Sequence, residues 1–221
     1  MGEGIGPTRR GDSSSFRGAI LLCGPPGSGK TTLLHQLLFG AAVRTVPSSQ
    51  VQALQAPLHH EAAGAPPRRL IDCPGAPRFR SQLLRYACEC AAVLVVVSAA
   101  GEAEQVRGAA AALYELYTDA AVVARAPRVL VVASKADAAA ALPLPRLRLA
   151  LERELQRLKG TRSASGGGGG DALLLGSLDV DFTFEREAPW APPEWETAVA
   201  VSAAQGGGLH LQGVQTFLSA L

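Results

Sequence analysis

The chain of 221 residues is poor in aromatic side chains, in cysteine and in net charge, and each scarcity argues against a type of core, of metal or redox site, or of binding partner. Aromatic residues make up 5% of the sequence and apolar residues 48%, so Ala, Leu and Val must fill most of the core. The net charge is only +2, far from the dense positive surface that drives nucleic-acid binding by counterion release. We therefore expect no direct binding of nucleic acid and a solvated surface for the arginines.

The few cysteines form no recognisable metal or redox motif. Cys23, Cys73, Cys88 and Cys90 include no Cys-x-x-Cys pair, and no histidine stands at metal-ligand spacing beside them. Cys23 and Cys73 each end an apolar run, so we expect them to pack as small buried hydrophobic residues. This usage is typical of a reduced, cytosolic protein.

Long hydrophobic runs are also missing. The longest uncharged apolar stretch, residues 91–100, has the length of a strand, whereas a membrane span needs about 20 residues. Residues 1–17 are polar and rich in glycine, without the apolar segment of a signal peptide, and Gly6 stands where a myristoylation motif has Ser or Thr. We expect residues 1–17 to be a flexible lead-in and the chain to contain no transmembrane span.

Short apolar runs rich in Val, Ile and Leu alternate with helical patterns along the rest of the chain. We predict strands over 19–24, 69–75, 92–99, 128–137 and 197–204, an exposed strand within 50–57, and helices over 30–40, 81–92, 102–125, 143–160 and 211–221. Strands that alternate with helices build a mostly parallel sheet with helices on both faces. The predicted fold is therefore a three-layer α/β domain over residues 18–221.

One segment interrupts this alternation. Residues 161–195 contain the sequence SASGGGGG, which has the composition of a flexible linker. We interpret the segment as a low-complexity insertion before the last strand and predict a short strand or hairpin for LDVDFTFE, residues 178–185.

The stretch GPPGSGKTT, residues 24–32, follows the first predicted strand and opens the first helix, which is the context of a phosphate-binding P-loop. Glycines let the backbone approach phosphates, and the N–H groups and helix dipole favour negative charge. Lys30 is predicted to reach the β- and γ-phosphates, and the Thr31 hydroxyl to bind Mg²⁺. The predicted nucleotide-binding residues of the loop are Gly24, Gly27, Ser28, Gly29, Lys30, Thr31 and Thr32.

A second motif, Asp72-Cys-Pro-Gly75, follows the strand predicted over 69–75. Asp72 is predicted to hold Mg²⁺ through water, and the Gly75 N–H to contact the γ-phosphate. ATP-hydrolysing proteins with such a loop usually have two acids here, the second of which polarises water, but Cys73 follows Asp72. An ordinary β-turn is the alternative interpretation of an Asp-x-Pro-Gly sequence.

The sequence SKAD, residues 134–137, points to the base. In the GTPase pattern N/T-K-x-D, the Asp accepts hydrogen bonds from guanine N1–H and the 2-amino group, and adenine would leave a buried Asp unpaired. Asp137 is therefore predicted to select guanine, with Lys135 along the base plane. Ser134 replaces the usual Asn and loses an amide that braces the loop, so we expect guanine specificity to survive with weaker affinity. Ser202 and Ala203 match a Ser-Ala element on the base side.

The four motifs in this order resemble Ras/Arf-type small GTPases and, more narrowly, the β subunits of the signal recognition particle receptor. The narrower resemblance rests on LLCGPPGSGKTTLLHQLLFG, LIDCPGAPRFRSQLLRYA, AAVLVVVSAA, the run from VLVVASKAD to TRSAS, and VDFTFE, which together cover most of residues 18–221. It implies a subunit that binds GTP and Mg²⁺ on the cytosolic face of the endoplasmic reticulum membrane. It also implies that the GTP-bound form binds the receptor's α subunit. The receptor would then help to deliver ribosome-bound nascent chains to the translocon.

Two departures from the family pattern, and a third from many GTPases, qualify the resemblance. Family members usually carry an N-terminal transmembrane helix, which we do not find in this chain. The first-switch Thr or Ser that caps Mg²⁺ could be Thr45 or Ser48, and the sequence does not choose between them. Ala76 stands where many GTPases have a Gln that orients water, so hydrolysis is expected to be very slow.

Two other functions compete with a GTP-binding docking module. A P-loop ATPase or nucleotide kinase would use an arginine-rich lid, which Arg78 and Arg80 could imitate, although a solvated switch segment is the preferred interpretation. A nucleotide-free scaffold would fit Ser134, Ala76 and the altered first switch, but it would have no need of the intact Lys30-Thr31 pair.

Overall fold

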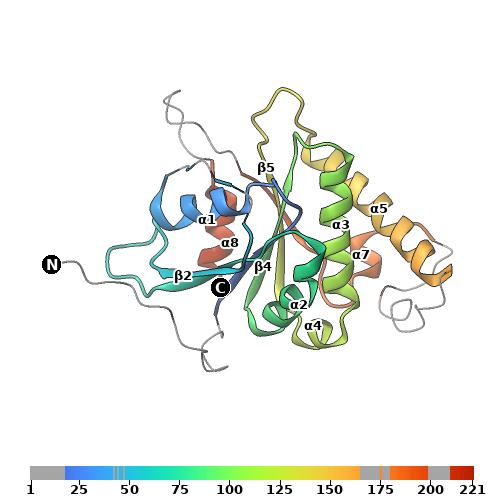
Figure 1. Ribbon diagram of the computed structural model, residues 1–221, viewed down its shortest axis with the longest axis horizontal. Coiled ribbons are helices and arrows are strands. Elements are labelled where there is room, and N and C mark those ends of the chain that lie inside the picture. The colour runs from blue at the N-terminus through green and yellow to red at the C-terminus, as the bar shows by residue number, and fades with distance from the viewer. Residues whose placement is uncertain are drawn as a thin grey trace.

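The computed structural model describes residues 18–221 except 42, 44, 47, 165–174, 176–179 and 199–209. Its strands form one six-stranded sheet in the order β2-β3-β1-β4-β5-β6 (Figure 1). Neighbouring strands are parallel except for β2 and β3, which are antiparallel. The predicted mostly parallel α/β sheet is confirmed. The strands are β1 (Ile20–Cys23), β2 (Gln52–Ala56), β3 (Arg68–Asp72), β4 (Ala92–Ser98), β5 (Arg128–Ser134) and β6 (Glu194–Ala198).

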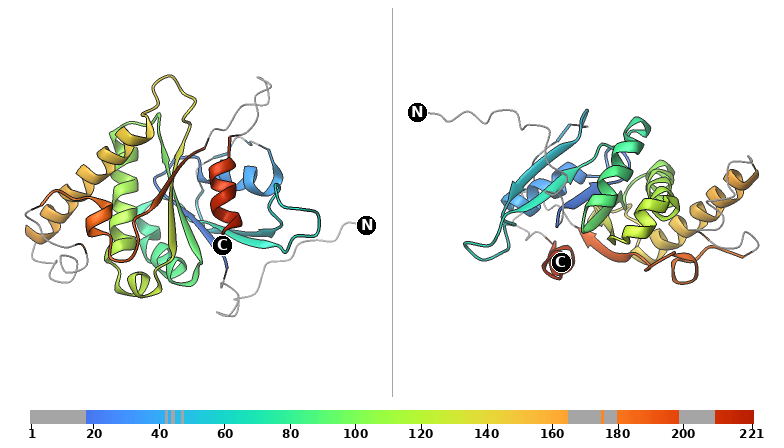
Figure 2. Two further views of the ribbon diagram at one scale, coloured as in Figure 1. Left: turned by 180° about the vertical axis from the view of Figure 1, so that it is seen from behind. Right: turned by 90° about the horizontal axis from the view of Figure 1, so that it is seen from below.

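Helices cover both faces of the sheet, as Figures 1 and 2 show. Helices α1 (Lys30–Phe39) and α8 (Gln212–Ser219) pack on one face. The other face carries α2 (Arg80–Glu89), α3 (Ala103–Thr118), α4 (Ala120–Arg125), α5 (Leu144–Ala164) and α7 (Phe184–Glu187). Buried β4 alternates between the two cores, since Val95 faces α3 while Val96 faces α1. The predicted three-layer architecture is confirmed.

The register of the parallel strands brings the three motifs to one edge of the sheet. Leu22 near the end of β1 pairs with Asp72 at the end of β3, and Ser98 at the end of β4 pairs with Ser134 at the end of β5. The loops after these strands therefore meet at the carboxyl edge, where ligands bind in open α/β sheets.

The single helix predicted over 102–125 is wrong, because the chain forms two helices with a break at Asp119. The Asp119 carboxylate accepts hydrogen bonds from the N–H groups of Ala121 and Val122, both at 3.0 Å, and so caps the start of α4. The Ala- and Val-rich sequence continues the helical pattern across this point, so apolar spacing alone gave no sign of the break.

The strand or hairpin predicted for 178–185 is also wrong over its described part, because Phe184 begins the short helix α7. Phe184 is fully buried against the rings of Tyr117, Phe182 and Trp195. Just beyond it, Glu187 of α7 forms a buried ion pair with Lys159 of α5. These tertiary contacts override the strand propensity of the Phe-Thr-Phe sequence, and they gather several of the chain's few aromatic residues.

The last strand lies earlier than predicted. β6 begins at Glu194 rather than 197 and ends at Ala198, while most of the predicted range 197–204 falls outside the described residues. The insertion predicted over 161–195 contains the end of α5, the helix α7 and the start of β6.

Cys23 and Cys73 are buried, as predicted, with 2% and 1% exposure. Burial raises the pKa of Cys73 to about 11 and raises that of Cys23 further, and both thiols are free. They therefore behave as small hydrophobic residues.

Among the helices of the described residues, we find none with both the length and the apolar character that a bilayer crossing demands.

Candidate nucleotide-binding site

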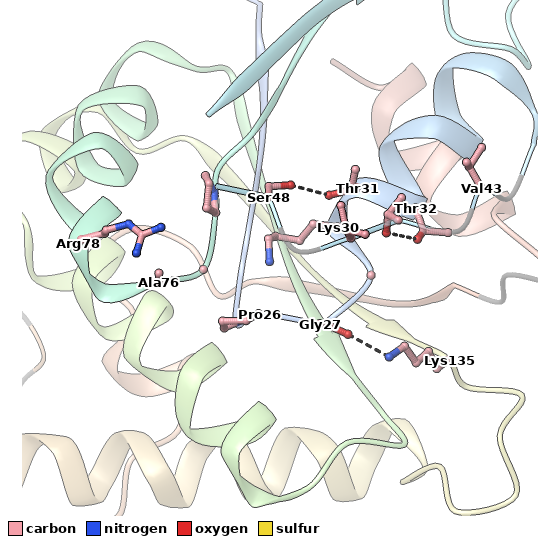
Figure 3. Close-up of a pocket in the computed structure, with 15 residues that line it drawn as sticks. Pro26, Gly27, Lys30, Thr31, Thr32, Val43, Ser48, Ala76, Arg78 and Lys135 are labelled. Carbon is pink, nitrogen blue, oxygen red and sulfur yellow. Dashed lines mark hydrogen bonds between the residues drawn. The ribbon is translucent and has the colours of Figure 1, made fainter. Parts of the chain in front are cut away.

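A cavity of about 730 Å³ opens at the carboxyl edge of the sheet, between the P-loop, the segment around Ser48 and the loop after β3 (Figure 3). The charged side chains that line it in the described part of the chain are three cations, Lys30, Arg78 and Lys135. A cavity with this lining favours an anionic ligand. The predicted site residues that line it are Gly27, Gly29, Lys30, Thr31, Thr32, Thr45, Ser48, Gly75 and Lys135.

The floor of the cavity is the P-loop, whose shape requires glycine. Gly27 and Gly29 have φ values of 72° and 92°, which L side chains rarely adopt. Gly24, with φ 127°, lies beneath the loop, where a Cβ would overlap the carbonyl oxygen of Val96. The sequence of the loop therefore fixes a backbone that a phosphate can approach closely.

Lys30 lies over this floor and is only 6% exposed. Its Nζ donates to the carbonyl oxygens of Gly24 at 3.0 Å and Pro25 at 2.8 Å, with a longer contact to Ser28 Oγ at 3.4 Å. Burial lowers the pKa of Lys30, and the nearby Asp72 carboxylate opposes that shift. The ammonium group is thus held by backbone carbonyls at the place where phosphates are expected.

Three oxygen-bearing side chains from different segments converge beside Lys30. The Thr31 hydroxyl donates to Asp72 Oδ2 at 2.5 Å, and Ser48 Oγ lies 3.3 Å from the same oxygen and 3.2 Å from Thr31 Oγ1. Asp72 is fully buried, and its Oδ1 has no hydrogen-bond partner among the described residues. A buried, unpaired carboxylate oxygen is costly, and Mg²⁺ prefers oxygen ligands, so this trio fits a magnesium ion.

Of the two first-switch candidates, the structure brings Ser48 and not Thr45 to Asp72. The Thr45 hydroxyl lies 3.3 Å from Thr32 Oγ1 instead. Both residues line the cavity, but Ser48 is the one that shares the carboxylate with Thr31.

At the end of the cavity predicted to hold the base, a serine side chain forms a hydrogen bond to the P-loop that the sequence did not predict. Ser134 Oγ donates to the P-loop carbonyl of Ser28 at 2.5 Å, with a second contact to Val97 O at 3.2 Å. Ser134 lacks the amide of the usual Asn, as expected, but its buried hydroxyl supplies a brace that residue type alone did not predict. Lys135, in the left-handed conformation with φ 53°, donates from Nζ to Gly27 O at 2.9 Å.

The other residues predicted to contact the base, Asp137, Ser202 and Ala203, are not part of the described lining of the cavity. Asp137 is exposed in the turn after β5 and is not among the described residues that line the cavity. Ser202 and Ala203 lie outside the described residues. Guanine selection by Asp137 therefore stays a prediction.

The loop after β3 packs directly on the P-loop. A Cβ at Gly75 would overlap the carbonyl oxygen of Gly24 and lie 2.6 Å from the carbonyl carbon of Pro25, so only glycine fits. Ala76 follows it in the cavity wall with a methyl group that cannot bind water by hydrogen bonding.

Helix α3 supports the P-loop from the other side. A Cβ at Gly108 would lie 2.7 Å from the Pro25 side chain, and Gln105 Nε2 donates to Pro26 O at 2.8 Å. From the sequence, the two prolines only restrict the phosphate-binding N–H groups to about residues 27–32; their packing contacts were not predicted, because the partners lie some eighty residues further along the chain.

Sequence reasoning also missed three lining residues, Val43, Val46 and Arg78. Val46 is 82% exposed, an unusual environment for valine at the rim of a polar cavity. Its only signal was its place between the two first-switch candidates. For Arg78, the sequence predicts a solvated switch segment, whereas the structure places it in the cavity wall.

The parallel sheet, the P-loop at its carboxyl edge and the cationic cavity define a P-loop nucleotide-binding protein with the small GTPase fold. Within this class, the chain belongs to the family of signal recognition particle receptor beta subunits, whose family model matches residues 15–186. No curated protein sequence matches the chain significantly.

Solved structures of that receptor have the same fold. The mammalian signal recognition particle receptor aligns with a TM-score of 0.72 at 27% identity, covering 91% of this chain and 98% of the other. The SRb-GTP/SRX complex from Chaetomium thermophilum aligns with a TM-score of 0.66 at 22% identity, over 91% and 99% of the two chains. The small GTPase Arl6 from Trypanosoma brucei aligns with a TM-score of 0.59 at 17% identity, over 92% and 98%.

Proposed function

We propose that the protein binds GTP with Mg²⁺ and, in the GTP-bound state, docks the α subunit of the signal recognition particle receptor. The observation that carries this proposal is the convergence of Thr31, Ser48 and Asp72 beside Lys30 in a cationic cavity. Membership of the receptor's β-subunit family supports the choice of partner, as does the relative SRb, solved with GTP and SRX.

In this proposal the chain's own residues bind and orient the nucleotide. P-loop N–H groups and Lys30 hold the phosphates, while Thr31, Ser48 and Asp72 hold Mg²⁺, which neutralises phosphate charge. Lys135 lies along the base, and Asp137 selects guanine.

Ser48 links the magnesium site to the first-switch segment, and this link makes the partner surface depend on the nucleotide. Val43 and Val46 precede Ser48 and are 44% and 82% exposed, so a contact of Ser48 with the metal would position these apolar side chains at the rim of the cavity. A segment held by metal and phosphate contacts is a common basis for switching.

We also propose that hydrolysis is very slow without a partner. Ala76 cannot orient the attacking water, so the bound state would persist as a docking surface. The expected result is retention of GTP by the purified protein through a single-turnover assay. Fast turnover by the protein alone would contradict this.

The binding test uses purified protein with labelled GTP in competition with ATP, GDP and xanthosine triphosphate. GTP and GDP should displace the label while ATP should not, because adenine offers no donors to Asp137. Equal competition by ATP would instead indicate an ATPase or nucleotide kinase. Absence of any nucleotide binding would indicate a scaffold.

The docking test captures the N-terminal domain of the receptor α subunit with the protein loaded with a non-hydrolysable GTP analogue or GDP. Capture should require the GTP analogue, and Val46→Glu should abolish it at analogue concentrations that saturate the variant, whose affinity is measured in parallel because Val46 lines the cavity. Leu149→Glu is the matched control, since Leu149 is also exposed but lies on α5. Equal capture in both nucleotide states would refute the switch.

The same role would place the protein on the cytosolic face of the endoplasmic reticulum membrane, serving delivery of ribosome-bound chains to the translocon. Flotation of the protein with microsomes, in the presence and absence of the α subunit, tests this location. Failure to float under either condition would contradict it.

A further inference from the structure

Arg78 is a cation in the nucleotide cavity without a carboxylate partner among the described residues. The next arginines along the chain each pair with an acid: Arg80 with Glu115 at 3.1 Å, and Arg85 with Glu89 at 3.8 Å. The Arg78 guanidinium instead lies over the ring of Phe79, 4.8 Å from its centroid. Because that ring is buried, the contact holds Arg78 against the cavity wall and leaves its donors available.

The position of Arg78 in the cavity suggests which part of a nucleotide it meets. Figure 3 shows Lys135 and Arg78 at opposite ends, with Lys30 between them and the Arg78 guanidinium directed toward the cavity. Lys135, bonded to Gly27, marks the end predicted for the base. A phosphate chain that starts there and passes Lys30 therefore has its last phosphate nearest Arg78.

We infer that Arg78 binds the terminal phosphate of a nucleoside triphosphate and makes the site prefer triphosphate over diphosphate. A guanidinium presents a planar fork of donors that suits phosphate oxygens. Lys30 is placed to serve more than one phosphate, whereas Arg78 reaches only the end of the chain. This inference rests on the proposed nucleotide-binding function and deepens it by naming a specificity-determining residue.

The local structure explains how a phosphate contact at Arg78 would affect the loop after β3. Arg78 belongs to the 3-10 turn Pro77–Phe79, which directly precedes α2 and follows Gly75 and Ala76. A phosphate held by Arg78 would therefore fix the loop after β3 through a side chain, independently of the Gly75 N–H. A diphosphate would leave this turn without that contact.

The experiment compares dissociation constants for a non-hydrolysable GTP analogue and for GDP in the full chain. Arg78→Ala should weaken binding of the analogue about tenfold, which corresponds to about 1.4 kcal/mol, and change GDP binding less than about twofold. Arg78→Lys should recover part of the loss, because it restores the charge without the fork. Arg85→Ala is the matched control, since it removes another exposed arginine, from α2 and outside the cavity.

A surface or structural role for Arg78 makes different predictions. If Arg78→Ala weakened the binding of both nucleotides equally, or did not weaken binding of the GTP analogue, the inference would be overturned. GTP binding by the unchanged protein would still support the proposed function. Failure of the unchanged protein to bind either nucleotide would overturn both. Arg78→Lys keeps the test valid should Arg78→Ala fold poorly.

Discussion

Ser134→Ala tests the brace between the base-side motif and the P-loop. The substitution removes the hydroxyl that donates to Ser28 O at 2.5 Å and leaves a buried carbonyl without that partner. Leaving a buried acceptor unsatisfied costs roughly 1–3 kcal/mol. In a chain of this size each kcal/mol lowers the melting temperature by roughly 2–4 °C, so we expect a decrease of roughly 2–12 °C.

Nucleotide binding should weaken as well, because a less ordered loop must be fixed when the ligand binds; about three- to tenfold is expected. Thermal unfolding without nucleotide and equilibrium binding of GDP measure the two effects. Ser134→Thr retains the hydroxyl and should recover both.

The matched control for this experiment is Ser98→Ala. Ser98 pairs with Ser134 across β4 and β5 and is similarly buried, and the described residues offer its side chain no hydrogen bond that we find. If Ser134→Ala and Ser98→Ala changed the melting temperature and the affinity equally, the hydrogen bond to Ser28 would not brace the loop and the reasoning would be refuted.

Four further substitutions test other parts of the structure. Asp137→Asn should shift preference from GTP toward xanthosine triphosphate in competition assays, and an unchanged preference would remove Asp137 from the base site. Ala76→Gln should raise single-turnover hydrolysis about tenfold or more, and no increase would show that water is positioned otherwise. Glu187→Ala should lower the free energy of unfolding in urea by about 3–5 kcal/mol, because Lys159 loses its buried carboxylate; a loss below about 1 kcal/mol would contradict this. Burial raises the pKa of Glu115 above its usual 4.5, so the native state is favoured while Glu115 is protonated and loses stability as pH rises through the raised pKa. Glu115→Gln cannot ionise and should therefore gain stability relative to the unchanged protein from mildly acidic to neutral pH. A stability difference that does not change with pH would refute this expectation.

The sequence predicted most of the fold because its signals are local. Short apolar runs identified the buried strands, and the P-loop, Asp72 and Ser134 all stand at the ends of such runs. Parallel strands bring their carboxyl ends to one edge, so predicting the strands also predicted where the motifs would meet.

The errors arose where distant contacts decide the structure. α7 forms because Phe184 and Glu187 find partners on α3 and α5, and no local pattern encodes those partners. The break at Asp119 is different, because aspartate is a favoured N-cap and could have been recognised as one.

The side chains of the site were predicted less completely than its backbone. Thr45 and Ser48 both suit the first switch by residue type, and only the folded path of the segment brings Ser48 to Asp72. The bracing role of Ser134 depends on a distance that sequence spacing does not specify.

The two prolines of the P-loop have a consequence for the kinetics of nucleotide exchange. Pro25 and Pro26 each fix a backbone φ angle, Gly108 leaves room for one ring, and Gln105 holds the carbonyl of the other. The loop therefore loses its conformational freedom when the protein folds, not when a ligand arrives. With a floor this rigid, nucleotide can enter and leave only by displacement of the outer walls around Ser48 and Lys135. An exchange factor would have to act on those walls.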